Sequence, residues 1–167
     1  MNRLLLESFP FRVLEGLCIA CCAVGAGEAI LYVREEYPQA RSRLERALEL
    51  WRAASLAPGV EIGVFSGPGA FVCGEETALI ASLEGRRGAP RFRPPFPEEA
   101  GLHGMPTLVN NVETLAAVPW IVRNGAEAYR SIGTAASPGT KTFALAGKVR
   151  RGGLVEVPLG MSLGRIV

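Results

Sequence analysis

The feature that most constrains the fold is a glycine-rich turn between a predicted strand and a predicted helix, in the stretch GPGAFVCGEETALIASLEG from Gly67 to Gly85. Before the turn, Val60, Ile62 and Val64 stand at every second position, which is typical of a strand. After the turn, the segment ETALIASL is typical of a helix. Because backbone can approach a ligand closely at glycine and a helix N-terminus offers unpaired N–H groups, this arrangement suits a nucleotide-like ligand.

Neither common phosphate-binding motif fits this turn. The segment GAFVCG has the two-glycine spacing of a P-loop, but Glu75 and Glu76 follow where Lys and Ser or Thr are required, and carboxylates repel a triphosphate. A dinucleotide fingerprint that starts at Gly67 would place its third glycine at Val72. On spacing alone, the two glutamates are explained equally well as acids that favour the helix dipole.

The preceding segments alternate between helix and strand. Ser8 is expected to cap a helix that ends at Gly25, Ala29–Val33 has the composition of a strand buried on both faces, and Pro38 opens a second helix. Together with the strand and helix around Gly67, this order predicts an α/β domain in layers, with a mainly parallel sheet flanked by helices.

Composition excludes several classes of protein. Of the 167 residues, 49% are hydrophobic, so a sizeable core is available, and the net charge of +2 gives no support for nucleic-acid binding. The longest apolar run, Val13–Ala26, is too short and too interrupted to span a membrane. No signal peptide is recognisable, and a cytoplasmic location is expected.

The cysteines do not form a recognisable metal motif. Cys18 and Cys21 make a CxxC pair beside Cys22, but Cys73 is the one other cysteine and His103 the one histidine. A zinc or iron–sulfur site usually offers two such pairs or a Cys/His set. We interpret these cysteines as small apolar core residues and predict no metal site in the chain.

A proline-rich segment follows the helix, RRGAPRFRPPFPEEAGLHGMP from Arg86 to Pro106. Its prolines predict a long loop without regular structure, and long loops in compact domains are frequently functional. Phe92 and Phe96 lie among arginines, which suits a planar anionic ligand such as a dinucleotide. A loop fixed by a buried Phe explains the composition equally well.

The next segment, TLVNNVET from Thr107 to Thr114, is predicted to be a short strand that ends at Asn110 and Asn111. Amide side chains at the carboxyl end of a strand are well placed to contact a ligand above a parallel sheet. Asn111 is also a suitable N-cap for the helix that follows, and either role accounts for the pattern.

A linker-like sequence, Ser137-Pro138-Gly139-Thr140, marks a predicted domain boundary. Two strands, Thr142–Lys148 and Leu154–Val157, are predicted after it, and Leu163–Val167 resembles the start of a helix. A hairpin and a short helix are too small for an independent core. We therefore predict one domain over 1–136 and the beginning of a second over 137–167.

Three motifs in this order, CGEETALIASLEG, PPFP and VNNVETL, resemble the NADH-oxidising flavoprotein of respiratory complex I, the family of its 51-kDa subunit. Diaphorase subunits of NAD-linked hydrogenases and formate dehydrogenases share the resemblance. It extends from Leu5 to about Trp120. The segment from Lys141 onward is similar to the beginning of the β-grasp (SLBB) domain that follows the flavin domain in that family.

The resemblance implies an FMN site in which FMN takes a hydride from NADH and passes electrons to iron–sulfur clusters. By position, Phe71 (a tyrosine in most of the family), Gly74, Glu75 and Glu76 would line the flavin and nicotinamide pocket. Val109, Asn110 and Asn111 would contact the flavin. Phe96 would pack against the adenine of NADH, and Glu76 would tune the flavin and hold the nicotinamide amide, with no side chain acting as acid or base.

Two parts of the family pattern have no counterpart in these residues: an upstream GRGGAGFPTG-type loop that holds phosphates, and a downstream cysteine motif that binds a 4Fe-4S cluster. The chain therefore resembles a central fragment, for which we expect weak FMN binding. The resemblance implies partners among the other subunits of an NADH dehydrogenase, hydrogenase or formate dehydrogenase, with attachment to the periphery of the inner membrane through them. The alternative function is a non-catalytic assembly module that keeps the fold without the cofactor.

Overall fold

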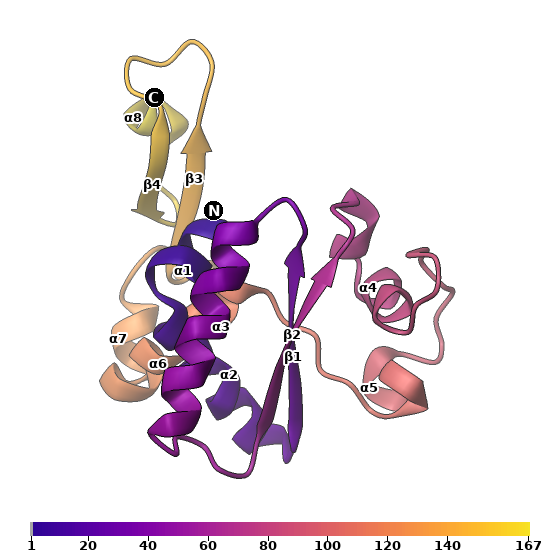
Figure 1. Cartoon of the computed structure of the whole chain (residues 1–167). Coiled ribbons are helices and arrows are strands. Elements are labelled where there is room, and N and C mark those ends of the chain that lie inside the picture. The colour runs from indigo at the N-terminus through magenta and orange to yellow at the C-terminus, as the bar shows by residue number, and fades with distance from the viewer. Residues whose placement is uncertain (1) are drawn as a thin grey trace.

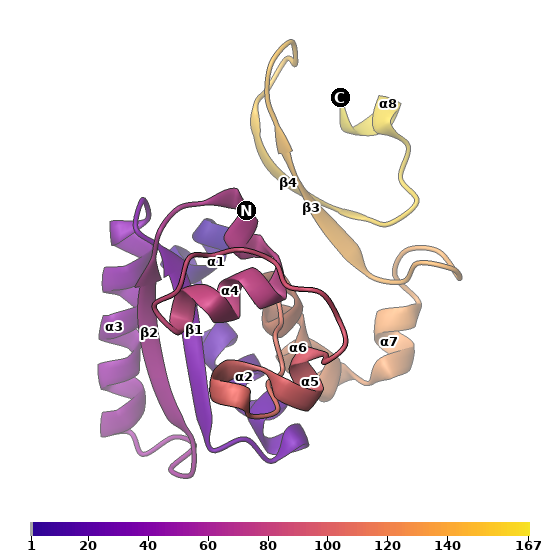
Figure 2. The ribbon, with the colours of Figure 1, turned by 90° about the vertical axis from the view of Figure 1, so that its right-hand side faces the viewer.

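The computed structural model describes residues 2–167, which form an α/β unit and a C-terminal β-hairpin (Figure 1). In the α/β unit, a parallel strand pair lies between two layers of helices. Helices α1, α2, α3 and α6 lie on one side of the strands, and α4 and α5 lie on the other (Figures 1 and 2). The predicted layered α/β architecture is confirmed.

The elements follow in this order along the chain: α1 Asn2–Ser8, α2 Pro10–Val24, β1 Glu28–Arg34, α3 Pro38–Ala53, β2 Glu61–Gly67, the 3₁₀ turn η1 Phe71–Gly74, α4 Glu76–Leu83, α5 Pro97–Ala100, the 3₁₀ turn η2 Leu102–Gly104, α6 Val112–Asn124, α7 Ala126–Arg130, β3 Thr140–Leu145, β4 Gly153–Pro158 and α8 Leu163–Ile166.

The pairing of β1 with β2 is parallel and in register, so that Leu31 lies opposite Val64 and Arg34 opposite Gly67. Both strands thus end at the same edge of the sheet. The core forms where α1, α2 and α3 cover these strands, and it includes Leu14, Leu44 and Ile62. Burial of apolar area at about 25 cal/mol per Å² is the main stabilising contribution of this layer.

Two glycines determine how helix α2 packs and where it ends. Gly16 lies against α6 so closely that an added Cβ would be 1.9 Å from the carbonyl oxygen of Leu115. Gly25 has a φ of 72° and ends the helix in the left-handed conformation that glycine adopts without strain. The predicted end of this helix is confirmed.

Three local predictions are wrong. Ser8 does not cap α2, because it is the last residue of α1, a helix that was not predicted. Phe9 is the N-cap residue of α2. The segment 86–106 contains regular structure, because Pro97 starts α5 and η2 follows it. Residues 107–109 form no strand and have no regular secondary structure.

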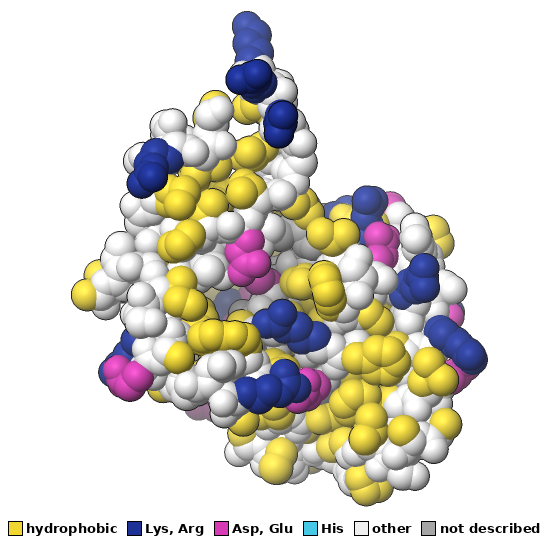
Figure 3. Space-filling view, turned by 90° about the vertical axis from the view of Figure 1, so that its left-hand side faces the viewer, with side chains coloured by type: hydrophobic (Ala, Val, Ile, Leu, Met, Phe, Trp, Pro, Cys, Tyr) yellow, Lys and Arg dark blue, Asp and Glu magenta, His cyan; other side chains and the backbone are white. Residues whose placement is uncertain are grey.

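The C-terminal strands β3 and β4 form an antiparallel hairpin, with Phe143 opposite Val155, and confirm the two predicted strands. The hairpin projects away from the α/β unit (Figures 1 and 2). Basic side chains gather at its tip (Figure 3), where the connection carries Lys148, Arg150 and Arg151. Among residues 2–167, no helix combines the length and the apolar character that crossing a membrane requires.

Candidate functional site

The turn after β2 contacts Arg34 and Glu36, which lie at the end of β1 and just after it. Arg34, the last residue of β1, donates hydrogen bonds to the carbonyl oxygen of Gly69 and to Oε1 of Glu36, the latter at 2.9 Å. The Glu36 carboxylate lies so close to Gly69 that an added Cβ would be 1.8 Å from its Oε1. A larger residue at position 69 would therefore displace the Glu36 carboxylate from this contact.

Helix α4 begins at the two glutamates. Glu75 is the N-cap, and its Oε2 accepts hydrogen bonds from the backbone N–H of Ala78 at 2.9 Å and from Oγ1 of Thr77 at 2.5 Å. Burial raises the pKa of Glu75, but these hydrogen bonds and the charge of Arg93 more than offset burial, and the pKa lies below its usual value. The interpretation of these acids as helix-favouring residues is thus correct for Glu75, which caps the helix.

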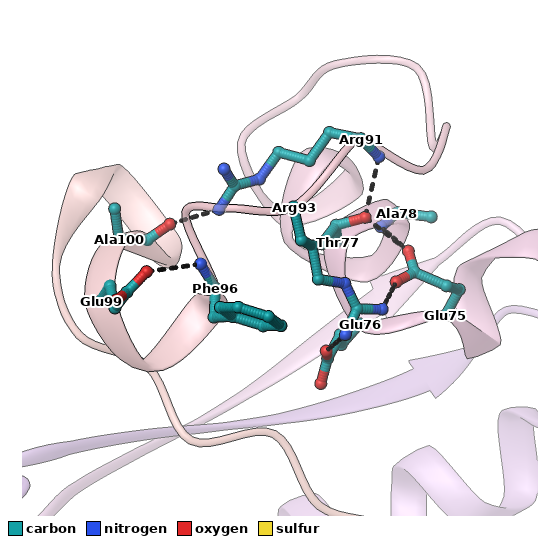
Figure 4. A network of polar contacts seen from close by, with 9 residues as sticks. All are labelled: Glu75, Glu76, Thr77, Ala78, Arg91, Arg93, Phe96, Glu99 and Ala100. Atoms are coloured by element: carbon teal, nitrogen blue, oxygen red, sulfur yellow. Dashed lines mark hydrogen bonds and ion pairs between the residues drawn. The ribbon is translucent and has the colours of Figure 1, made fainter.

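Arg93 joins the two glutamates (Figure 4). Its Nη2 lies 2.8 Å from Oε1 of Glu75, and its Nη1 donates to Oε1 of Glu76. The three side chains are about one-third exposed, at 37% for Arg93, 30% for Glu75 and 32% for Glu76. Sequence reasoning did not single out Arg93, since nothing in local spacing connects it to residues 17 and 18 positions earlier.

The loop that carries Arg93 is fixed to α4 and α5. The backbone N–H of Arg91 donates to Oγ1 of Thr77 at 3.0 Å, and the Arg91 guanidinium donates to the carbonyl oxygen of Ala100. Phe96 is the N-cap of α5, where its N–H donates to Oε2 of Glu99 at 3.0 Å. The Phe96 ring is 43% exposed and points toward the Arg93–Glu76 pair (Figure 4).

Two predicted flavin contacts lie in η1, between β2 and α4. Phe71 is 97% exposed, which leaves a whole aromatic side chain uncovered by residues 2–167. At Gly74, an added Cβ would meet no atom within 4 Å, so space is open beside this backbone. Past the carboxyl ends of β1 and β2, the chain therefore presents the exposed side chain of Phe71 and open space beside the backbone of Gly74.

The amide motif, residues 109–111, lies at the start of α6. Asn111 is the N-cap, with its Oδ1 accepting from the N–H of Glu113 at 2.9 Å, which confirms the predicted cap. Asn110 is exposed and Val109 is half-buried. Glu113 itself accepts from Lys141 and from the backbone N–H of Thr142 on β3.

The predicted site residues thus form two groups. Glu75 and Glu76 are linked through Arg93, and Phe96 points toward them, whereas Asn111 is linked to Glu113. Within 2–167, no hydrogen bond or ion pair joins the first group to the second.

Residues 1–120 match the sequence model of one protein family, the Nuo51 FMN-binding domain. The chain belongs to this family.

Two named proteins resemble the whole chain. It is 47% identical to the NADP-reducing hydrogenase subunit HndC of Solidesulfovibrio fructosivorans, with 100% of this chain and 36% of that protein aligned. It is 44% identical to one of the NADH-quinone oxidoreductase subunits of Rhizobium meliloti (strain 1021), with 99% of this chain and 41% of that protein aligned. The chain thus spans about two fifths of the length of these relatives.

A solved structure shows the same fold. The chain superposes on a chain of an NAD⁺-reducing [NiFe]-hydrogenase in the H₂-reduced state with a TM-score of 0.94 and 48% sequence identity. The match covers 99% of this chain and 29% of that chain. The match therefore includes the hairpin as well as the α/β unit.

Proposed function

We propose that this chain is part of the flavin- and NADH-binding module of an NADH dehydrogenase, or diaphorase. Membership in the Nuo51 FMN-binding family supports the proposal, as do the names of the relatives, which belong to an NADH-quinone oxidoreductase and to an NADP-reducing hydrogenase. The observation that carries it is the uncovered Phe71 side chain in η1, the turn that precedes the two Arg93-bound glutamates at the start of α4, past the carboxyl ends of a parallel strand pair.

The residues present fit FMN chemically. Its isoalloxazine ring is flat, with apolar faces and a polar edge. An aromatic side chain exposed at 97% supplies an apolar surface, the open backbone at Gly74 permits close approach, and the exposed Asn110 amide can both donate and accept hydrogen bonds. Among residues 2–167, none covers the Phe71 side chain or fills the space beside Gly74, and none forms a side-chain hydrogen bond with the Asn110 amide.

FMN, when bound, supplies hydride acceptance from NADH and the release of electrons one at a time. The residues have other tasks. Phe71, Gly74, Val109, Asn110 and Asn111 would hold and orient the flavin.

Glu75 and Glu76 would lie at the side where the nicotinamide enters, with Glu76 accepting from the carboxamide of NADH. Phe96 would pack on its adenine. Because these contacts are hydrogen bonds and ring contacts, no proton transfer by a side chain is needed.

In the whole protein, electrons would leave through iron–sulfur clusters toward other subunits of a dehydrogenase or hydrogenase complex. We place the site of action on the cytoplasmic side, with any contact to the inner membrane made through such subunits. We further propose that residues 137–167 begin a β-grasp (SLBB) domain, on the basis of the β3–β4 hairpin and the α8 turn that follows it.

Titration of the purified chain with FMN tests the proposal, with quenching of flavin fluorescence as the measurement. We expect saturable quenching at tens of micromolar, and weaker binding for Phe71→Ala, because that variant loses the apolar surface. Phe92→Ala is the matched control, since Phe92 is 98% exposed and has no proposed role with flavin. Absence of saturable quenching would favour the non-catalytic assembly module.

A further inference from the structure

The C-terminal hairpin is attached to helix α6 through the side chain of Glu113. This side chain is 24% exposed. Its Oε2 accepts from Nζ of Lys141, and its Oε1 accepts from the backbone N–H of Thr142 at 3.3 Å. Both donors lie on β3, 28 and 29 residues further along the chain. A single carboxylate therefore binds two successive residues of the hairpin.

The backbone of the same residue is bound to the amide motif. The N–H of Glu113 donates to Oδ1 of Asn111 at 2.9 Å, which is the N-cap contact of α6. The carboxylate can reach Lys141 and Thr142 only while the first turn of α6 keeps its position. Conversely, a displacement of β3 would act through the carboxylate on Glu113, whose N–H is bound to Asn111.

Few other contacts fix the hairpin. Among residues 2–167, the hydrogen bonds and ion pairs between the hairpin, 140–158, and residues before 130 are those to Glu113. Within the hairpin, Val157 is the buried large apolar residue, at 7% exposure. Because little apolar packing restrains the hairpin, loss of the Glu113 contacts would free it to move about the turn at 137–139.

We propose that Glu113 is a latch that couples the position of the hairpin to the amide motif 109–111. Binding free energies between coupled sites are reciprocal, so order at either end raises order at the other. The consequence that flavin at the amide motif would restrain the hairpin rests on the function proposed above. The latch itself is a property of the ligand-free chain.

Amide hydrogen exchange resolved by NMR tests the latch in both directions, on the ligand-free chain. Lys141→Met removes a contact on the hairpin side and should speed exchange at the Glu113 amide about three- to tenfold, as expected for the partial loss of one charge-assisted hydrogen bond. Asn111→Ala removes the cap and should speed exchange at the Thr142 amide by a similar factor. Asn111→Asp keeps a capping oxygen and should restore slow exchange at Thr142.

Two control variants match these changes. Lys148→Met removes a lysine from the same hairpin, and Asn124→Ala removes an amide that binds the Trp120 carbonyl at the other end of α6. Both should leave the Glu113 and Thr142 amides unchanged. The proposal is overturned if Lys141→Met speeds exchange only in the hairpin, or if Asn111→Ala speeds exchange only at the start of α6.

A second measurement separates the latch from the flavin site. In the wild-type chain, added FMN should slow exchange at Thr142, and in Glu113→Ala it should not. If FMN does not bind, the function proposed above fails, while reciprocal exchange effects in the ligand-free chain still establish the latch.

Discussion

At the scale of single residues, the candidate site combines two carboxylates with one guanidinium. Two adjacent carboxylates would repel, but Arg93 binds both, and the α4 N-terminus stabilises Glu75 through the Thr77 and Ala78 contacts. These side chains are about one-third exposed, so each pair contributes modestly to stability, at about 0–1 kcal/mol. Their larger effect is on the electrostatic potential beside Glu76.

Glu76→Gln is expected to raise the midpoint potential of bound flavin. A negative charge disfavours the addition of electrons, and an interaction of about 1–2 kcal/mol near a protein surface corresponds to about 20–40 mV for a two-electron couple. Arg93→Gln should lower the potential, because it exposes both carboxylates. Redox titration of the flavin-loaded protein measures this, with Glu28→Gln at the far end of β1 as control. An unchanged potential in Glu76→Gln would contradict the proposed position of this residue.

Glu75→Gln is expected to destabilise the chain at pH 7 by about 0.5–1 kcal/mol, because Gln keeps a capping oxygen but loses the charge that interacts with Arg93 and the α4 N-terminus. The pKa of Glu75 is lower in the folded chain than its usual value, so its stabilising contribution is present above about pH 4.5 and is lost as the pH falls through the folded pKa. Urea unfolding should therefore separate the two proteins at pH 7, and the difference should shrink as the pH falls through the folded pKa of Glu75. A difference that does not shrink as the pH is lowered would show that lost packing, and not charge, is responsible.

At the scale of elements, close backbone approach fixes how the layers pack. Helix α2 meets α6 at Gly16, and Gly67 at the end of β2 leaves room for the Tyr32 ring, whose hydroxyl is 3.0 Å from Oγ of Ser82 on α4. The first contact joins two helices on one side of the sheet, and the second ties α4, on the other side, to β1. The position of α4, and with it of both glutamates, thus depends on β1.

Gly16→Ala is expected to lower the free energy of unfolding by about 1–3 kcal/mol or more, because the new methyl group would collide with the Leu115 backbone, which cannot rotate away. Cys22→Ala is the control on the same helix, since Cys22 is exposed. Chemical denaturation of both variants measures the difference. Equal stability of Gly16→Ala and the wild type would mean that α2 and α6 are less closely packed.

At the scale of the whole molecule, the chain consists of one packed unit and an appended hairpin. The core cluster draws on residues from Leu6 to Ala116 and includes none from the hairpin. The polar contacts of Glu113 with β3 join the two parts. The predicted division at 136/137 lies between this core cluster and the hairpin, and it stays a prediction.

A chain truncated after residue 136 is expected to fold, with a thermal midpoint within a few degrees of the full chain, since the removed residues carry little buried apolar area. Circular dichroism during heating measures the midpoint. A truncation that begins inside α7, after Glu127, serves as comparison because it also removes Tyr129, which packs against Trp120. Collapse of the 1–136 fragment would refute the domain division.

Local pattern was sufficient for most elements and for several caps. A short apolar run identified β1, alternating apolar residues identified β2, helical spacing identified α2 and α3, and Asn111 was recognised as an N-cap. Sequence also led to the family through three short motifs. Each of these signals depends on residues within a few positions of one another, where backbone geometry alone decides which side chains meet.

Only the tertiary structure decided which distant residues meet. The Arg93 bridge to Glu75 and Glu76, and the contacts of Glu113 with Lys141 and Thr142, join segments whose separation depends on the path of the intervening loops. The missed helix α1 and the α5 turn are short, and packing rather than intrinsic propensity stabilises helices of that length. Sequence thus determined the elements and the chemistry of the motifs, while the folded chain determined their partners, because contact between distant segments is a property of the whole packed arrangement.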